Sequence, residues 1–341
     1  MERSRLQPPG KRARTAYAAA LATACGLAAG GCAGGADAPS THEALGQAIQ
    51  PIIGGEASGT SHDAVVVLAL FRDGGRRGLC SATLVAPNLL LTARHCVSET
   101  DSSAACGLDG EPVVGAGLHG DRAAADFAVF VGKDGVAPPS TSEAAASARG
   151  ARLVVDDTHT ICNRDLAFLV LDRGLSAPIA PLRLAGATAS DELTAVGWGL
   201  TEEGKLPSRR LARSDVAWIG AGPMLFPEST QWGIGDAEFM VGESACAGDS
   251  GSPALAKSGA VVGVASRAGN GKPRDPANPA SPCMGPTAHA VYTHLGAAKD
   301  LVARAFAAAG HEPWLEGEPD PRAPAAPAPC DAGACGDGGA S

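Results

Sequence analysis

A few short segments of the chain hold the residue types that a serine nucleophile needs. Ser250 lies in the segment Cys246-Ala-Gly-Asp-Ser-Gly-Ser-Pro253, and a serine hydroxyl is a weak nucleophile until a neighbouring base takes its proton. His95 is a candidate for that base, and Asp165 is a candidate for the carboxylate that orients the imidazole. Asp165 opens the apolar run Leu166–Leu171. Together these residues indicate nucleophilic catalysis by a serine.

Each residue also has a plainer explanation when it is taken alone. Gly-Asp-Ser-Gly is an ordinary turn sequence, most histidines are structural or exposed, and Asp156, Asp157 and Asp172 are alternatives to Asp165. The apolar run decides for Asp165, because it places the carboxylate at the start of a buried strand. The presence of all these segments in one chain favours catalysis over turns.

Repeated short apolar runs predict the elements that must hold these residues. Between Ile52 and about Gly310, Gly, Pro and Asp separate runs of strand length with aliphatic or β-branched content. These runs are Ala64–Leu70, Ser81–Val85, Leu89–Thr92, Phe127–Val131, Leu166–Leu171, Leu193–Val196 and Ala260–Ala265. Such a pattern favours a barrel or sandwich over a parallel sheet. The Ala-rich stretch Leu295–Ala309 predicts a helix that closes the domain.

Composition narrows the class of protein and of partner. The 341 residues suffice for one large or two small domains, and 45 Gly and 25 Pro with few aromatic residues are typical of a loop-rich β protein. The net charge of −9 argues against a nucleic-acid partner, which normally needs a basic face.

The N-terminus predicts export. Basic residues are followed by the apolar, Ala-rich run Ala16–Ala29, as in a secretory signal peptide, and the run is short for a membrane span. Leu27 to Cys32 resembles a bacterial lipoprotein cleavage box, although Leu27 lies two positions too far from Cys32, and Cys25 has a similar defect. Lipidation and ordinary cleavage near residues 31–38 both stay open. We expect a bacterial protein that is secreted or anchored to the outer membrane by lipid alone.

Changes in composition divide the chain into four parts. We expect a signal peptide over residues 1–32, a tether or propeptide over 33–51, one domain over 52–310, and a Pro/Ala/Gly-rich tail over 311–341. Cys330 and Cys335 in the tail are candidates for a small loop disulfide.

Residues 52 to about 310 resemble the chymotrypsin/trypsin family of serine endopeptidases, with the motifs in the order of that family. The resemblance implies two packed six-stranded antiparallel β-barrels with a C-terminal helix and an active site between the barrels. It implies that Ser250 is the nucleophile, His95 the general base and Asp165 the orienting acid. It also implies that the backbone amides of Gly248 and Ser250 form an oxyanion hole.

The segment Ile52-Ile-Gly-Gly55 resembles the activation sequence of this family. Cleavage before Ile52 would free an α-amino group, which the resemblance pairs with the carboxylate of Asp249 to form the oxyanion hole. Gln50-Pro51 depart from the family, because a basic residue usually precedes the cleaved bond. Another protease therefore trims the propeptide, or activation differs here. Gly197-Trp-Gly199 matches a further family marker, a turn in the second barrel.

The same resemblance suggests the shape of the substrate pocket. Ser244 matches the pocket base and is uncharged, while Ala268 and Ala290 match two wall positions. Ser266 matches the serine that supports the orienting aspartate beside the pocket. We expect preference for small to medium apolar residues before the scissile bond, and cleavage restricted to Arg or Lys would contradict this. The insertion 269–281 borders the pocket.

The cysteines fit an exported member of this family. The resemblance implies the pairs Cys80–Cys96 and Cys246–Cys283, and Cys106–Cys162 would clamp the segment before Asp165. No coenzyme motif or metal cluster is evident, so we expect no cofactor.

Two functions from different classes remain. The first is a serine endopeptidase that cleaves proteins or peptides through a Ser-His-Asp triad and an acyl-enzyme. The second is a catalytically weak homologue that binds a protein partner, which the Gln50-Pro51 junction and Arg94 favour. Arg94 stands beside His95 where the family has a small residue, and we expect it to point to solvent or to pair with a carboxylate.

Overall fold

The computed structural model describes residues 52–199, 206–272, 275, 278 and 280–323. The chain divides into two units, residues 1–45 and 46–341, and every described residue belongs to the second. The expected signal peptide, tether and Gln50-Pro51 junction lie outside the described residues, as do Cys25, Cys32, Cys330 and Cys335. Among the described residues, no helix has the length and apolar character needed to span a membrane.

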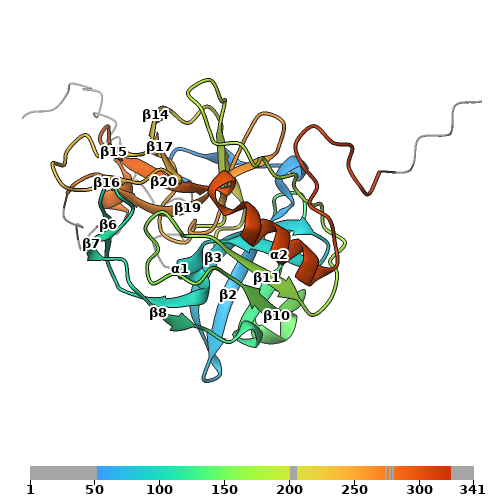
Figure 1. Ribbon diagram of the computed structural model, residues 1–341. Coiled ribbons are helices and arrows are strands. Elements are labelled where there is room, and N and C mark those ends of the chain that lie inside the picture. The colour runs from blue at the N-terminus through green and yellow to red at the C-terminus, as the bar shows by residue number, and fades with distance from the viewer. Residues whose placement is uncertain (1–51, 200–205, 273–274, 276–277, 279, 324–341) are drawn as a thin grey trace, which may run out of the picture. The chain divides into compact units, whose positions relative to one another are not determined.

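Six antiparallel strands close into a barrel in the first half of the domain (Figure 1). Their order is β10-β11-β4-β3-β2-β9, with bounds β2 (Val65–Arg72), β3 (Gly75–Ala86), β4 (Leu89–Thr92), β9 (Phe127–Phe130), β10 (Ala148–Val154) and β11 (Ala167–Leu171). Strands β4 and β11 are buried along their whole length. Phe168 of β11 packs edge-on against Phe306 of the C-terminal helix, 6.4 Å between ring centroids, so the aliphatic run is covered outside the barrel as well.

The second half is an antiparallel sheet of eight strands in the order β1-β13-β12-β18-β19-β20-β17-β14. Their bounds are β1 (Glu56–Ala57), β12 (Thr194–Gly197), β13 (Leu211–Arg213), β14 (Trp218–Ala221), β17 (Glu238–Gly242), β18 (Pro253–Leu255), β19 (Val261–Gly269) and β20 (His289–His294). The prediction of an all-β, trypsin-like fold is confirmed, but this sheet is not the closed six-stranded barrel that we expected. Strands β13 and β14 follow each other without pairing, and Asp215 between them adopts φ 52.

A smaller sheet joins segments from the two halves. It has the order β15-β16-β6-β7, with bounds β6 (Ala104–Cys106), β7 (Pro112–Gly115), β15 (Met224–Leu225) and β16 (Gly233–Ile234). Its central pair brings Cys106 opposite Gly233. A second small pair consists of β5 (Ser98–Thr100) and β8 (Leu118–Asp121).

Helices are few in the described part of the chain. They are α1 (Arg94–Val97) and α2 (Lys299–Ala309), with 3-10 turns η1 (Thr60–His62), η2 (Ala124–Asp126), η3 (Glu143–Ala145), η4 (Ser281–Cys283) and η5 (Leu295–Ala298). The stretch expected to form one helix over Leu295–Ala309 is therefore η5 followed by α2. Gly310 ends α2 in the left-handed conformation, φ 76.

The chain stays packed beyond the expected domain end at residue 310. Leu182 donates its N–H to the carbonyl of Trp314 at 2.9 Å and accepts the N–H of Glu316 at 2.9 Å. The Glu316 carboxylate binds the guanidinium of Arg183. Residues 311–323 therefore belong to the packed structure, and only the rest of the expected tail lies outside the described residues.

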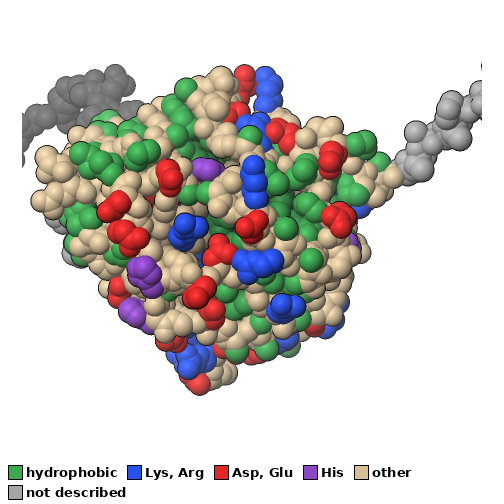
Figure 2. Space-filling view, in the orientation of Figure 1, with side chains coloured by type: hydrophobic (Ala, Val, Ile, Leu, Met, Phe, Trp, Pro, Cys, Tyr) green, Lys and Arg blue, Asp and Glu red, His purple; other side chains and the backbone are tan. Residues whose placement is uncertain are grey.

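Surface charges are mixed on the face shown in Figure 2. Lys and Arg side chains lie among Asp and Glu side chains there and do not gather into one basic patch.

Candidate active site

Pairing of β4 with β11 brings His95 and Asp165 together. Ala167 lies opposite Thr92, so the residues just beyond this pair, Asp165 before β11 and His95 after β4, lie side by side. His95 Nδ1 is 2.8 Å from Asp165 Oδ2, and the backbone N–H of His95 donates to Oδ1 at 2.9 Å. Ser266 of β19 donates its hydroxyl to Oδ2 at 2.5 Å. The carboxylate is thus held from both halves of the domain.

Burial and charge act against each other on this pair. Complete burial is the largest single effect on the pKa of Asp165 and raises it, but the His95 charge and the hydrogen bonds from His95 and Ser266 hold that pKa below its usual range. Burial lowers the pKa of His95, and the charge of Asp165 with its hydrogen bond more than offsets this, so the pKa lies above its ordinary value. An ionised Asp165 keeps the imidazole proton on Nδ1 and leaves Nε2 free to act as a base.

Ser250 lies in a tight turn between β17 and β18. Gly248 adopts φ 88, a conformation that favours glycine, and the N–H of Ser81 donates to the carbonyl of Ser250 at 2.9 Å. Within the described part of the chain, the N–H groups of Gly248 and Ser250 donate to no other group. These two amides are therefore available to an oxygen atom of a ligand.

The structure does not join Ser250 to His95. Among the described residues, Ser250 Oγ has no hydrogen-bond partner, and His95 Nε2 lies 3.9 Å from Cys96 Sγ. Contacts between a nucleophile and its base are often long without substrate and tighten when substrate binds. The Nε2 position is thus free of any competing strong hydrogen bond.

Asp249, next to Ser250, is fully buried and accepts three N–H groups. Ile52 donates to Oδ2 at 2.9 Å, Cys246 donates to Oδ2 at 3.1 Å, and Gly199 donates to Oδ1 at 2.8 Å. Burial, only partly opposed by these hydrogen bonds, raises the pKa of Asp249 to about 6. A Cβ atom at Gly197 would lie 2.1 Å from Oδ1, which explains the glycine that begins the Gly-Trp-Gly segment.

The N-terminal residues of the domain have their own anchor. Arg213 Nη1 donates to the carbonyl of Ile53 at 2.9 Å and to the carbonyl of Glu243 at 2.7 Å. Ile52 itself is fully buried and packs with the core of the second sheet. The segment that begins at Ile52 is therefore fixed next to Asp249.

Three disulfides lie around these residues. The structure joins Cys80 to Cys96 beside His95, Cys106 to Cys162 before Asp165, and Cys246 to Cys283 beside the Ser250 turn. Cys80, His95 and Cys96 also bring potential metal-ligand atoms within 4.8 Å of one another. The two sulfurs are bonded to each other and are not thiolates, so this group does not bind a metal.

A small pocket opens next to Ser250. Its volume is about 200 Å³, and its lining includes Ser250, Ser266 and Ala268 together with Ala245, Cys246, Ala247, Ala265, Arg267 and Cys283. Ser244 and Ala290, the other two expected pocket residues, are buried and do not line it. A larger cavity of about 720 Å³ shares Arg267 and Ala268 with the small pocket and extends to Phe226 and Trp232.

Arg94 turns away from the imidazole beside it. Its guanidinium binds the carboxylate of Asp121 in β8 at 2.8 Å and donates to the carbonyl of Asp156 at 3.3 Å. Burial lowers the pKa of Arg94, although Asp121 opposes this effect. Of the two orientations expected for this side chain, the structure has the ion pair.

Two charged contacts near the site were not expected from the sequence. Arg213 holds the backbone of Ile53, and Arg267 forms a buried ion pair with Glu238. Neither residue lies in a motif, because their partners come from distant strands. For Arg267, the only signal in the sequence was a charged residue directly after Ser266, in a strand whose other positions are mostly buried.

A family comparison agrees with this geometry. The model of the trypsin family, described as "Trypsin", matches residues 52–281, which is most of the chain. No curated protein matches the chain. The family match begins at Ile52 and covers His95, Asp165 and Ser250. The chain therefore belongs to the trypsin family of serine proteases.

Proposed function

We propose that this protein is a serine endopeptidase in which Ser250, His95 and Asp165 act as a catalytic triad. The observation that carries the proposal is the fully buried Asp165 carboxylate, which His95 and Ser266 contact, close to a serine turn with two unused amides. A buried carboxylate in this position has a clear chemical use, since it stabilises the imidazolium that forms when His95 takes a proton.

The reaction then runs in two acyl-transfer steps. Ser250 Oγ attacks the substrate carbonyl while His95 Nε2 takes its proton, and the N–H groups of Gly248 and Ser250 stabilise the oxyanion. His95 gives the proton to the leaving amine, and an acyl-enzyme on Ser250 remains. Water, with His95 again as base, hydrolyses this ester and regenerates the serine.

Activation is proposed to require cleavage before Ile52. Ile52 adopts φ 47, which is strained for a β-branched residue inside a continuous chain but is unrestricted for an amino terminus. Its nitrogen already lies 2.9 Å from Asp249. The free α-ammonium group would neutralise a carboxylate whose burial is otherwise unfavourable. A separate protease is the proposed agent, because Gln50-Pro51 is not a tryptic site.

The small pocket supports a preference for small to medium apolar residues before the scissile bond. Ala268 is exposed at its wall, and none of the described residues that line it carries a carboxylate. Ala268→Val should lower kcat/KM for peptides with Leu at this position about 10-fold more than for peptides with Ala, because the added methyl groups narrow the pocket. A peptide series with Ala, Val, Leu, Phe and Arg at this position measures the effect. Cleavage of Arg peptides alone would contradict the proposed preference.

The three disulfides support a site of action outside the reducing cytoplasm. The proposed bacterial export, with or without a lipid on the N-terminal segment, depends on residues 1–51 of the sequence.

The direct test is the intact mass of protein recovered from an exporting bacterial host, with and without a fluorophosphonate probe. We expect one adduct per chain on a species that begins at Ile52, and no adduct on Ser250→Ala. An adduct on a longer species would show that the site forms without the new amino terminus. Folded protein that begins at Ile52 and takes no probe would instead favour the protein-binding homologue.

A further inference from the structure

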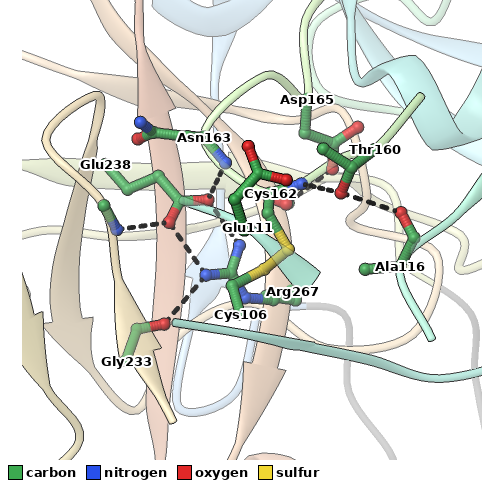
Figure 3. The surroundings of a disulfide bond; sticks show 12 residues. Cys106, Glu111, Ala116, Thr160, Cys162, Asn163, Asp165, Gly233, Glu238 and Arg267 are labelled. Atoms are coloured by element: carbon green, nitrogen blue, oxygen red, sulfur yellow. Dashed lines mark hydrogen bonds and ion pairs between the residues drawn. A yellow bond between two sulfur atoms is a disulfide. The ribbon is translucent and has the colours of Figure 1, made fainter. Parts of the chain in front are cut away.

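A buried ion pair lies next to the residues that hold Asp165. Arg267 follows Ser266 in β19, and its guanidinium binds the carboxylate of Glu238 at the start of β17 (Figure 3). Nη2 is 2.8 Å from Oε2, and Nη1 donates to Oε1. The Glu238 side chain is fully buried, and the Arg267 side chain is 11% exposed.

Glu238 also binds the loop that leads to Asp165. Its Oε1 accepts the N–H of Asn163 at 3.1 Å, and its Oε2 accepts the N–H of Gly235 at 3.2 Å. In return, Asn163 Oδ1 accepts the N–H of Ala237 at 2.6 Å. One carboxylate therefore connects β17 with the backbone two residues before Asp165, as Figure 3 shows.

This loop has a conformation that needs support. Asn163 adopts φ 63, which is uncommon for residues other than glycine, and Cys162 before it is bonded to Cys106. Such a conformation persists where neighbouring contacts determine it. Here the disulfide holds one residue and the Glu238 carboxylate holds the next.

Arg267 provides the contact on the opposite side. It lies between Ser266, which donates to Asp165, and Ala268, and together with both it lines the pocket beside Ser250. Its Nη2 also donates to the carbonyl of Gly233 in β16 at 3.2 Å. The guanidinium thus fixes the part of β19 that carries Ser266.

We propose that the Arg267–Glu238 pair is a positioning device of the active site, which holds Ser266 and the loop before Asp165 in one arrangement. The inference rests on the proposed triad. Arg267 and Glu238 touch no reacting atom, and they act through Ser266 and Asn163 on the Asp165 carboxylate, and through it on His95.

Stability alone is a weak explanation for this pair. Burial of two charges costs several kcal/mol per ion, and apolar replacements of buried ion pairs are often neutral or stabilising. Burial lowers the pKa of Arg267, but the charge of Glu238 holds it above the ordinary value, so the guanidinium stays charged. A double replacement therefore separates a positioning role from a structural one.

The test uses protein that has been cleaved before Ile52, made from the full chain with Arg267→Met, Glu238→Gln, and the double variant Arg267→Met with Glu238→Met. We expect each single variant to lower the rate constant for fluorophosphonate labelling of Ser250 by roughly 10- to 100-fold, because small misplacements of a catalytic group have effects of this size. The double variant should fold and remain slow. Recovery of the wild-type rate in the double variant, or unchanged rates in folded single variants, would overturn the proposal.

Two further variants sharpen the test. Arg267→Lys keeps the charge and should recover part of the labelling rate. Arg183→Met is the matched control, since it breaks a partly buried ion pair with Glu316 and Asp191 away from the site. It should reduce stability and leave labelling unchanged. An equal loss of labelling in this control would assign the effect to general destabilisation and overturn the proposal.

A spectroscopic readout keeps this proposal separate from the proposed function. The proton NMR signal of His95 Nδ1–H reports its hydrogen bond to Asp165 whether or not the protein turns over substrate. We expect the signal to shift or exchange away in the single variants and to persist in Arg183→Met. If wild-type protein takes no probe, the proposed function fails, while an unchanged NMR signal in the variants is what would refute the positioning role.

Discussion

Asp165→Asn is expected to lower kcat/KM for peptide hydrolysis by roughly 10⁴-fold, the size of loss known for the equivalent change elsewhere in this family. Asparagine keeps the shape of the side chain but not its charge. Its amide then favours the wrong imidazole tautomer, and His95 Nε2 no longer serves as the base. Hydrolysis of a peptide series together with fluorophosphonate labelling measures the loss.

The pH profile of the same variant gives a second, independent sign. In the wild-type protein the pKa of His95 lies above its ordinary value because of Asp165, so activity should fall as pH drops through that raised value. Without the carboxylate, burial lowers the pKa, and the acid limb should move to lower pH. Asp172→Asn is the matched control, because Asp172 binds Arg173 beyond the end of β11 and does not contact His95. An identical profile in Asp165→Asn and wild type would contradict the assigned role.

Cleavage before Ile52 is expected to raise the labelling rate of Ser250 by roughly 10²- to 10³-fold. This is the typical loss of rate when one donor of an oxyanion hole is removed. The two forms are made from one chain by replacing the residues before Ile52 with the recognition site of a specific protease. The reason for the expected increase is Asp249, which accepts the amide N–H of Ile52 in the uncleaved chain and should form an ion pair with the new α-ammonium group after cleavage. Equal labelling of the two forms would show that the site needs no new amino terminus.

The same switch should be visible in stability. In the uncleaved Ser250→Ala protein the pKa of Asp249 is raised to about 6, above its unfolded value. A raised folded-state pKa contributes stability at low pH that is lost as pH rises through that pKa. The contribution of Asp249 to the free energy of unfolding should therefore fall by about 2 kcal/mol between pH 4 and pH 7. Denaturant titrations should show a smaller fall in the cleaved protein, where the ammonium group offsets the buried charge, and in uncleaved Asp249→Asn.

Much of the fold could be predicted from local sequence. The seven aliphatic runs fall in β2, β3, β4, β9, β11, β12 and β19, because each run is long enough for a strand and is bounded by turn residues. Strands such as β10 and β20 were not expected, since Arg149 and Arg152 interrupt β10, and His289 and His294 stand at the two ends of the short strand β20. Their burial arises from neighbours that only the folded sheet supplies.

The candidate site divides in the same way. His95, Asp165, Ser250 and Gly248 lie in short motifs, so a resemblance to a family was enough to select them, and the structure places His95 against Asp165. The Arg267–Glu238 pair could not be predicted, because it depends on the order of β17, β20 and β19 in the sheet. The pocket was predicted only in part, because Ser266 and Ala268 line it whereas Ser244 and Ala290 are buried and do not.

The small sheet β15-β16-β6-β7 affects how the domain unfolds. Its strands come from both halves of the domain, and the Cys106–Cys162 bond ties one of them to the segment before Asp165. One half cannot open without breaking hydrogen bonds that belong to the other, so the two halves should unfold in a single cooperative transition. For the proposed peptidase this coupling matters, because neighbouring molecules would cleave a half-open chain, whereas a chain that unfolds only as a whole is rarely exposed to cleavage.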